Sequence, residues 1–451
     1  MAITRTGVVI STNPTFGDSD DMDFYINGGQ LGINQVPVSG LTPDTVYYAK
    51  GYVQQDGVTI TDPSYTAFRT RSANFFHIKN EYAGNNTVTL MRRGNNQITV
   101  PTIEISKDAV TWDTLTFPLG SGNEIYNEVT LSQGECMYMR GQGGFNPTNS
   151  NNNLFFIDAS QNYSIAGDIT SVFDYTDPTI DTLPRNACYE LFYHNVSGNV
   201  YASQTLLGAH QSVFAKIKYL EGYSLMRTFA YCPNFTYYNL DNVETIGSGS
   251  LVGTFEYTGI TELSLPNLSY VPMYSAEMGS MCEGCTSLLK ASIPNMPAAD
   301  LNVFQNAFEG CTALQEVDLS GITYADRNPF FRTFHDCTSL TKVDLSGLTE
   351  LRSSAFSGTF WNCTSLQEID LSHITSIATP NPNTPQFYQT FMGCSALEKV
   401  YGPNVTTWDS SYFDNWMYQV KNTGTYYKPS ALNVTTSDLG LPGAWTIQDY
   451  Q

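Results

Sequence analysis

Apolar residues recur at fixed positions in three successive stretches of the chain, residues 308–322, 334–348 and 360–374. Each stretch has a phenylalanine, a cysteine three residues later, a leucine three residues after that, and then two aliphatic residues that alternate with polar ones. This alternation predicts a short strand, in which Val317 and Leu319 face a core while Asp318 and Ser320 face solvent. Because one unit cannot bury its apolar face alone, the repetition predicts a solenoid of stacked coils with a parallel β-sheet.

One cysteine recurs in each coil, at intervals of 26 residues between Cys285 and Cys363. Six of the nine cysteines occupy this position: Cys232, Cys285, Cys311, Cys337, Cys363 and Cys394. A recurring position of this kind predicts a column of small buried hydrophobes, and neighbours in such a stack need not have disulfide geometry. Cys282 and Cys285 form a C-x-x-C pair, for which a zinc or redox site is the alternative. Cys282 fills the position of the repeat phenylalanine, so packing is favoured and no metal site is predicted.

The repeated phrase F-x-x-C-[TS]-[SA]-L-x-x-[VI]-D-L-S resembles the BspA-like leucine-rich repeats of bacterial surface proteins and of viruses of gut Bacteroidales. The resemblance extends from about Asn186 to Gln451 and implies a non-enzymatic surface or interaction module. Residues 165–401 are therefore predicted to form the leucine-rich-repeat solenoid. From Trp408 the period breaks, and residues 402–451 resemble the C-terminal cap that follows such repeats, covering the last coil.

Residues 1–72 alternate as strands and turns, and three of their phrases resemble a fibronectin type III domain: G-V-V-I-S-T-N-P, G-L-T-P-D-T-V-Y-Y-A-K-G-Y and A-F-R-T. In that family the first phrase belongs to the third strand, so the first two strands are missing here. A sandwich without them exposes a sheet edge. We hypothesise that a neighbouring chain supplies a strand, which would make this domain the attachment end. The alternative is a smaller self-contained sandwich.

Residues 73–164 contain regularly spaced, alternating segments with Gly and Asn turns between them, which predict a β-sandwich domain. The expected strands are residues 75–79, 86–91, 103–106, 112–117, 128–131, 137–141 and 155–158. The run from Ile103 to Trp112 and the phrase L-S-Q-G-E-C-M-Y-M-R-G resemble a β domain that precedes these repeats in gut-phage proteins. The whole chain is thus expected to be mainly β.

Composition narrows the range of partners. The formal net charge is −21, with 21 Lys and Arg against 42 Asp and Glu. Nucleic acid and anionic membranes bind through clustered cations, so neither is an expected partner. No apolar run has the length of a spanning helix, and the N-terminus lacks the apolar core of a signal peptide, so export by the usual route is not expected. The acidic segment 18–23 is interpreted as a solvated hairpin, with a calcium site as the less favoured alternative.

No catalytic constellation is found in the sequence: nucleotide-binding, metalloprotease and nucleophile-elbow motifs are all missing. Acid pairs such as those of glycosidases could come from Asp318, Asp344 and Asp370, but these are outward consensus positions that predict a solvated ladder. We therefore expect neither an enzyme nor a cofactor. A solenoid suits binding through aromatic side chains at non-consensus positions. The candidate ligand-binding residues are Tyr231, Tyr237, Tyr238, Tyr274, Tyr324, Trp361 and Tyr388.

Three functional hypotheses follow. The first is an appendage of a Bacteroidales (crAss-like) phage: a head fibre, tail fibre or decoration protein on the virion surface. It would dock on other virion proteins through its N-terminal domain and present the solenoid to a host surface glycan or protein. Fibres are commonly closed cyclic assemblies, so a homo-oligomer, such as a trimer, is expected. The alternative is a bacterial cell-surface adhesin, and an enzyme acting on surface glycans is the least favoured.

Overall fold

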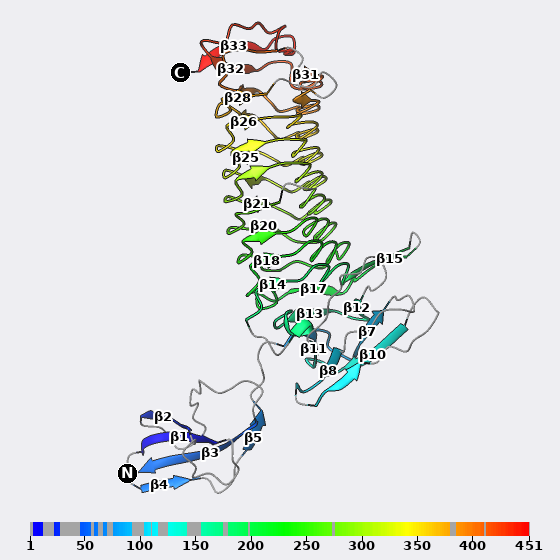
Figure 1. Ribbon diagram of the computed structural model, residues 1–451, viewed down its shortest axis with the longest axis vertical. Coiled ribbons are helices and arrows are strands. Elements are labelled where there is room, and N and C mark those ends of the chain that lie inside the picture. The colour runs from blue at the N-terminus through cyan, green and yellow to red at the C-terminus, as the bar shows by residue number, and fades with distance from the viewer. Residues whose placement is uncertain are drawn as a thin grey trace.

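The computed structural model describes residues 3–11, 22–27, 46–55, 58–61, 66–69, 75–92, 103–109, 111–115, 125–141, 155–174, 179–196, 199–272, 276–378, 385–409 and 412–450. Strands and turns make up almost all of these residues, and the one helix among them is a single turn, α1 (Ser171–Asp174). Figure 1 shows a long stack of coils that begins beside a group of strands and ends at the C-terminus. The expectation of a mainly β fold is confirmed.

The N-terminal strands form one five-stranded antiparallel sheet of order β2-β1-β3-β4, with β5 also paired to β3. The strands are β1 (Ile3–Ser11), β2 (Met22–Asn27), β3 (Val46–Gln55), β4 (Val58–Thr61) and β5 (Thr66–Arg69). Tyr52 crosses the sheet and donates a hydrogen bond of 2.7 Å from its hydroxyl to Asp23. Residues 18–21 of the acidic segment lie outside the described residues. The fibronectin-like assignment and the completion by a neighbouring chain remain predictions.

The next strands form two sheets that share one core. A three-stranded antiparallel sheet has the order β10-β7-β12, and a six-stranded sheet has the order β17-β13-β6-β11-β8-β9. All seven strands expected in this region have a counterpart. The bounds are β6 (His77–Asn80), β7 (Asn86–Arg92), β8 (Ile103–Ser106), β9 (Asp113–Leu115), β10 (Ile125–Leu131), β11 (Cys136–Gly141), β12 (Phe155–Ala159), β13 (Tyr163–Ala166) and β17 (Leu206–Ala209). β17 pairs in parallel with β13 and so connects these sheets to the first coils.

Each coil of the solenoid contributes short strands that pair in parallel with those of the next coil. One ladder contains β20 (Glu262–Ser264), β21 (Lys290–Ser292), β23 (Glu316–Asp318) and β25 (Lys342–Asp344). In the coils that follow, β27 (Glu368–Asp370) and β30 (Lys399–Tyr401) pair in parallel in a separate sheet. Val317 and Leu319 are buried as expected, although the strand begins one residue before the predicted Val-x-Leu step.

A second ladder of two-residue strands was not predicted. It contains β22 (Ala298–Ala299), β24 (Tyr324–Ala325), β26 (Glu350–Leu351) and β28 (Ser376–Ile377). The earlier coils carry β14 (Thr182–Leu183), β18 (Tyr219–Leu220) and β19 (Thr245–Ile246) in a parallel sheet of their own, and β15 (Tyr193–Val196) and β16 (Asn199–Ala202) form a hairpin. Further along, β29 (Phe387–Tyr388) pairs in parallel with β31 (Phe413–Asp414).

Columns of identical side chains hold the coils together. The repeat phenylalanines stack across successive coils, with ring centroids 5.6 Å apart between Phe308 and Phe334 and 5.5 Å apart between Phe334 and Phe360. The repeat cysteines are buried, as expected, and the thiol of Cys337 donates a hydrogen bond of 3.1 Å to the carbonyl oxygen of Phe308 in the preceding coil. Because protein interiors are close-packed, the side chains that follow one another in a column are of similar size from coil to coil.

The coils turn through backbone positions of left-handed conformation that recur every fourth residue. In one coil these are Asn302, Asn306 and Gly310, and in the next Asn328, Arg332 and Asp336, all with positive φ. Gly, Asn and Asp adopt this conformation at the least cost, which explains why they often precede the repeat cysteine.

The parallel sheet does not end where the sequence period breaks. β32 (Thr425–Pro429) pairs in parallel with β30, and β33 (Thr446–Tyr450) pairs in parallel with β32. A single cluster of buried hydrophobic residues runs from Phe76 to Trp445, across residues 164 and 401. The division into domains at those two residues remains a prediction.

Candidate functional site

The predicted aromatic residues lie on different parts of the solenoid. Tyr237 and Tyr238 line one small pocket of about 340 Å³. Tyr237 is exposed, whereas Tyr238 packs 4.4 Å from the Phe255 ring and donates a hydrogen bond from its hydroxyl to the carbonyl oxygen of Glu262. Tyr238 therefore serves the packing between coils.

The remaining candidates do not adjoin that pocket within the described residues. Tyr324 lies on the second ladder beneath the Arg352 guanidinium, 4.2 Å from its ring centroid. Trp361 packs 4.8 Å from the His335 ring, and Tyr388 is exposed on β29. Tyr274 lies outside the described residues. That any of these residues contacts a ligand remains a prediction.

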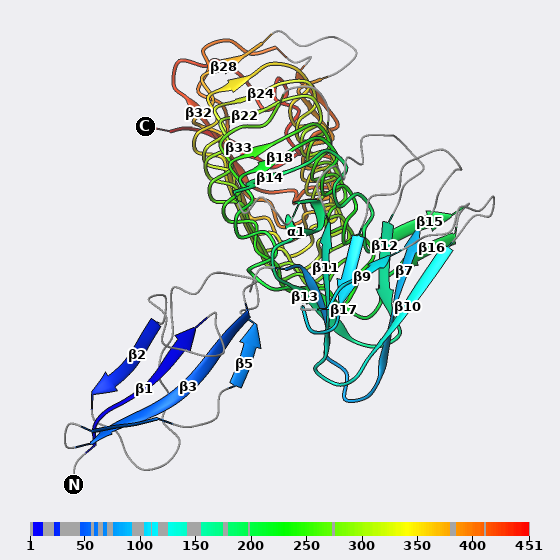
Figure 2. The same cartoon turned by 60° about the horizontal axis from the view of Figure 1, so that its bottom comes forward.

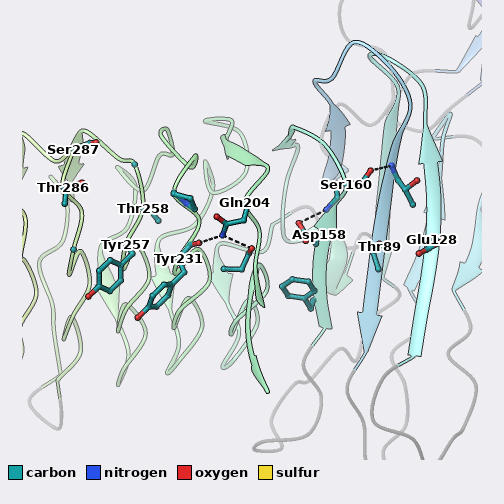
Figure 3. A pocket seen from close by; sticks show the side chains of 17 residues that line it. Thr89, Glu128, Asp158, Ser160, Gln204, Tyr231, Tyr257, Thr258, Thr286 and Ser287 are labelled. Atoms are coloured by element: carbon teal, nitrogen blue, oxygen red, sulfur yellow. Dashed lines mark hydrogen bonds between the residues drawn. The ribbon is translucent and has the colours of Figure 1, made fainter. Parts of the chain in front are cut away.

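Tyr231 lines a different pocket, a groove of about 1230 Å³. We call it the junction groove. One wall comes from the three-stranded sheet and carries Thr87, Thr89, Glu128, Phe156, Asp158, Ala159 and Ser160. The other comes from β16 and the first coils and carries Ala202, Gln204, Tyr231, Pro233, Tyr257, Thr258, Gly259, Gly284, Thr286 and Ser287. Figures 2 and 3 show the sheet standing beside these coils, with Gln204 between the tyrosines and the sheet.

A ladder of three tyrosines borders this groove. The ring centroids of Tyr193 and Tyr231 are 5.5 Å apart, and those of Tyr231 and Tyr257 are 4.7 Å apart, both in stacked orientation. Tyr257 is 43% exposed, and this exposed part of the side chain can contact a ligand. In Figure 3 the rings of Tyr231 and Tyr257 lie side by side with their hydroxyls on the same side.

The groove is hollow because the residue before the repeat cysteine changes along the stack. This position is Tyr231 and Tyr257 in two successive coils and Gly284 and Gly310 in the next two, all with positive φ. The Tyr257 ring leans into the space that a side chain at Gly284 would fill, since a Cβ there would lie 2.3 Å from its Cε1. The tyrosine ladder therefore ends at Gly284, where the wall of the groove is formed by backbone without a side chain.

Carboxylates dominate the electrostatics around the groove. The pKa of Asp158 is raised by burial, against hydrogen bonds that it accepts from the Ser203 hydroxyl at 2.7 Å and the Ala159 N–H at 2.8 Å. The pKa of Tyr257 is raised by burial and then by the negative charges of Glu283 and Glu256. None of the described residues that line the groove is Lys, Arg or His.

Sequence reasoning did not identify Tyr257, Gln204 or the sheet residues as site residues. Tyr257 could have been found, because it stands at the same repeat position as Tyr231, directly before Thr258 in the cysteine slot. The contribution of β7, β10 and β12 has no signal in the repeat pattern, because it depends on how the sheet is placed against the coils.

In the described part of the chain, no group of three or more His, Cys, Asp or Glu side chains is arranged to hold a metal ion. No described helix has the length and apolar character needed to span a bilayer.

Comparison with protein families agrees with the geometry of the coils. Residues 223–359 and 280–423 match the model of a BspA type leucine rich repeat region, in six copies. No curated protein matches the chain. Repeat regions of this type point to adhesion or binding at a surface. The chain carries a BspA-type leucine-rich repeat region, and this region forms the greater part of its solenoid.

Proposed function

We propose that the protein is a non-enzymatic binding module that recognises a cell surface through the junction groove. The observation that carries this proposal is the exposed tyrosine ladder beside a polar groove of about 1230 Å³. Ligand sites are commonly concave and lie where structural units meet, with aromatic surface and a few placed polar groups. The groove has all of these features.

The setting that we favour is a phage virion appendage, a head fibre, tail fibre or decoration protein of a Bacteroidales phage. Its N-terminal domain would dock on other virion proteins, in a homo-oligomer such as a trimer, and the solenoid would face the host. Two features support this setting: the resemblance of the segment from Ile103 to Gly141 to a β domain of gut-phage proteins, and the two strands that residues 1–72 lack relative to a fibronectin type III domain. A bacterial surface adhesin is the second candidate, because a BspA-type repeat region suits both.

Binding to fixed Bacteroidales cells tests the site, with Tyr257→Ala compared with Tyr270→Ala. Tyr270 is a matched control because it is an exposed solenoid tyrosine, 57% accessible, that does not line the groove. We expect Tyr257→Ala to lower the cell-bound fraction at least tenfold and Tyr270→Ala to leave it unchanged. Equal binding by both variants would refute the groove as the site.

Mass spectrometry of density-purified virions and of host envelope fractions tests the setting. A virion component is expected to be enriched with the capsid protein at fixed stoichiometry. Recovery in the envelope fraction alone would refute the virion and support the adhesin.

A further inference from the structure

Besides its two tyrosines, the junction groove is lined by six serine and threonine side chains: Thr87, Thr89, Ser160, Thr258, Thr286 and Ser287. Hydroxyls both donate and accept, so they suit a ligand that is itself rich in hydroxyls. Gln204 adds an amide, although its NH₂ group already donates to the carbonyl oxygens of Ala202 and Tyr231, each at 3.1 Å. Gln204 lines the groove, and its side-chain oxygen can accept a further hydrogen bond.

The tyrosine ladder supplies the apolar part of the site. A pyranose ring has faces of C–H bonds that pack on an aromatic face, where the ring quadrupole is negative, while its hydroxyls reach polar neighbours at the edge. Tyr257 offers both parts, an exposed ring and a hydroxyl. Tyr231 supports it from behind at 4.7 Å, so the ring is held in place before a ligand arrives.

The charge of the groove restricts the ligand further. Asp158 and Glu128 line one wall, Glu256 and Glu283 lie close to Tyr257, and no described lining residue is cationic. An anionic sugar would bring like charges into a partly buried site, which is unfavourable. A neutral sugar can instead donate hydroxyl hydrogens to the carboxylates, and hydrogen bonds to charged acceptors are the stronger kind.

We propose that the junction groove binds a neutral oligosaccharide, with Tyr257 as the stacking platform and Asp158 and Glu128 as hydroxyl acceptors. This rests on the proposed function and names its ligand class. The groove exceeds the roughly 300–1,000 Å³ that encloses a drug-sized molecule, so a chain of several sugar units fits better than one. A peptide is less favoured, because the described lining offers few aliphatic anchors: Ala159, Ala202 and Pro233.

Isothermal titration of the full chain with hexasaccharides tests the ligand class. The probes are neutral glucan, mannan and N-acetylglucosamine hexamers, compared with a hexamer of galacturonic acid. At least one neutral hexamer is expected to bind at least tenfold more tightly than the galacturonate, with the gap narrowing at high salt. Equal or tighter binding of the galacturonate, or no binding of any neutral hexamer, would overturn the proposal.

Two glycine variants test the platform without replacing Tyr257. Gly284→Ala places a Cβ against the Tyr257 ring, whereas Gly310→Ala, at a similar φ of 73° against 70°, has nothing closer than 3.7 Å. Both variants have similar backbone strain, so a difference between them reports on the space at Gly284 that the Tyr257 ring occupies. We expect at least a fivefold loss of affinity for Gly284→Ala alone, and a smaller loss for Tyr257→Phe, which keeps the ring and removes only the hydroxyl. Equal affinities for the two glycine variants would refute the platform.

Treatment of the cells separates this proposal from the function on which it rests. Periodate, which cleaves vicinal diols, is expected to abolish binding that depends on Tyr257, and protease is expected to leave it intact. The reverse result would show that the groove recognises a surface polypeptide, so the ligand class would fail while the binding function stood. If Tyr257→Ala bound untreated cells as well as the unsubstituted protein does, both the ligand class and the groove as the binding site would be refuted.

Discussion

Burial raises the pKa of two carboxyl groups near the tyrosine ladder, those of Asp158 and Glu256. Asp158 keeps its hydrogen bonds to Ser203 and Ala159, and Glu256 has Arg227 3.7 Å away, yet burial raises the pKa of both. Asp344, on the outer face of the solenoid, shows the opposite balance. It accepts a hydrogen bond of 3.0 Å from the backbone N–H of Ser346, which lowers its pKa. An ionised Asp158 therefore destabilises the folded protein, whereas an ionised Asp344 stabilises it.

Asp158→Asn is expected to make the protein at least as stable at pH 7, because the amide oxygen can accept the same two hydrogen bonds without a buried charge. The folded pKa of Asp158 lies above the unfolded value of 3.8, so its contribution to stability falls as pH rises through the interval between them. Urea unfolding at pH 7 and at pH 3.5 measures the gain in the free energy of unfolding, which should vanish at the lower pH.

Asp344→Asn is the matched comparison and should change stability in the opposite direction. Its folded pKa lies below 3.8, so its stabilisation is present above that value and is lost as pH falls through the folded pKa. A stabilising Asp344→Asn, or a destabilising Asp158→Asn at pH 7, would contradict this account.

Residue-scale prediction from the sequence succeeded where a position repeats. The buried cysteine column follows from spacing alone, and Cys285, Cys311, Cys337 and Cys363 are all buried. The hydrogen bond from each of these thiols to the preceding coil could not be predicted, because it depends on the distance between coils. Gly284 illustrates the same limit: its role is to make room for Tyr257, a contact between residues 27 positions apart.

At the scale of elements, the first ladder carries alternating charges in register. Glu262 pairs with Lys290, Lys290 with Glu316, and Glu316 with Lys342, on an exposed face of the sheet. The Lys290 ammonium lies 3.1 Å from the Glu316 carboxylate. In a parallel stack every coil could slip by one residue, and a row of opposite charges favours the register in which they face each other.

Glu316→Lys is expected to destabilise the solenoid, because three lysines would then face one another across adjacent strands. Exposed pairs of this kind contribute up to about 1 kcal/mol, so the loss should be of that order. Urea unfolding in low salt measures it, and 1 M NaCl should remove most of it because screening then acts over about 3 Å. Glu316→Gln is the control and should lose less. A loss that salt does not reduce would show that packing is responsible instead of charge.

The strands that could be predicted from the sequence are those whose residues alternate between apolar and polar. The first ladder was expected because Val317 and Leu319 alternate with polar residues over several positions. The second ladder was not, because strands such as Tyr324–Ala325 have two residues and show no alternation to detect. The continuation through β32 and β33 was missed for a related reason: hydrogen bonds between coils extend the sheet after the sequence period has ended.

At the scale of the whole molecule, the two proposed tasks, attachment and recognition, fall on separate parts. The buried cluster that includes the solenoid begins at Phe76, and the described strands of the N-terminal sheet pair only among themselves. Every residue that lines the junction groove lies between Thr87 and Ser287. The proposed recognition therefore uses residues that follow the N-terminal sheet, whereas the proposed attachment uses that sheet.

Removal of residues 1–72 is expected to separate these tasks. The shortened protein should bind Bacteroidales cells within twofold of the full chain and keep its unfolding midpoint, since neither the groove nor the buried cluster uses the removed strands. In a phage whose copy of the gene carries the deletion, purified virions should lack the protein, as mass spectrometry would show. Virions that retain it would place the attachment surface on the solenoid, and a loss of cell binding by the purified variant would mean that the N-terminal sheet takes part in recognition.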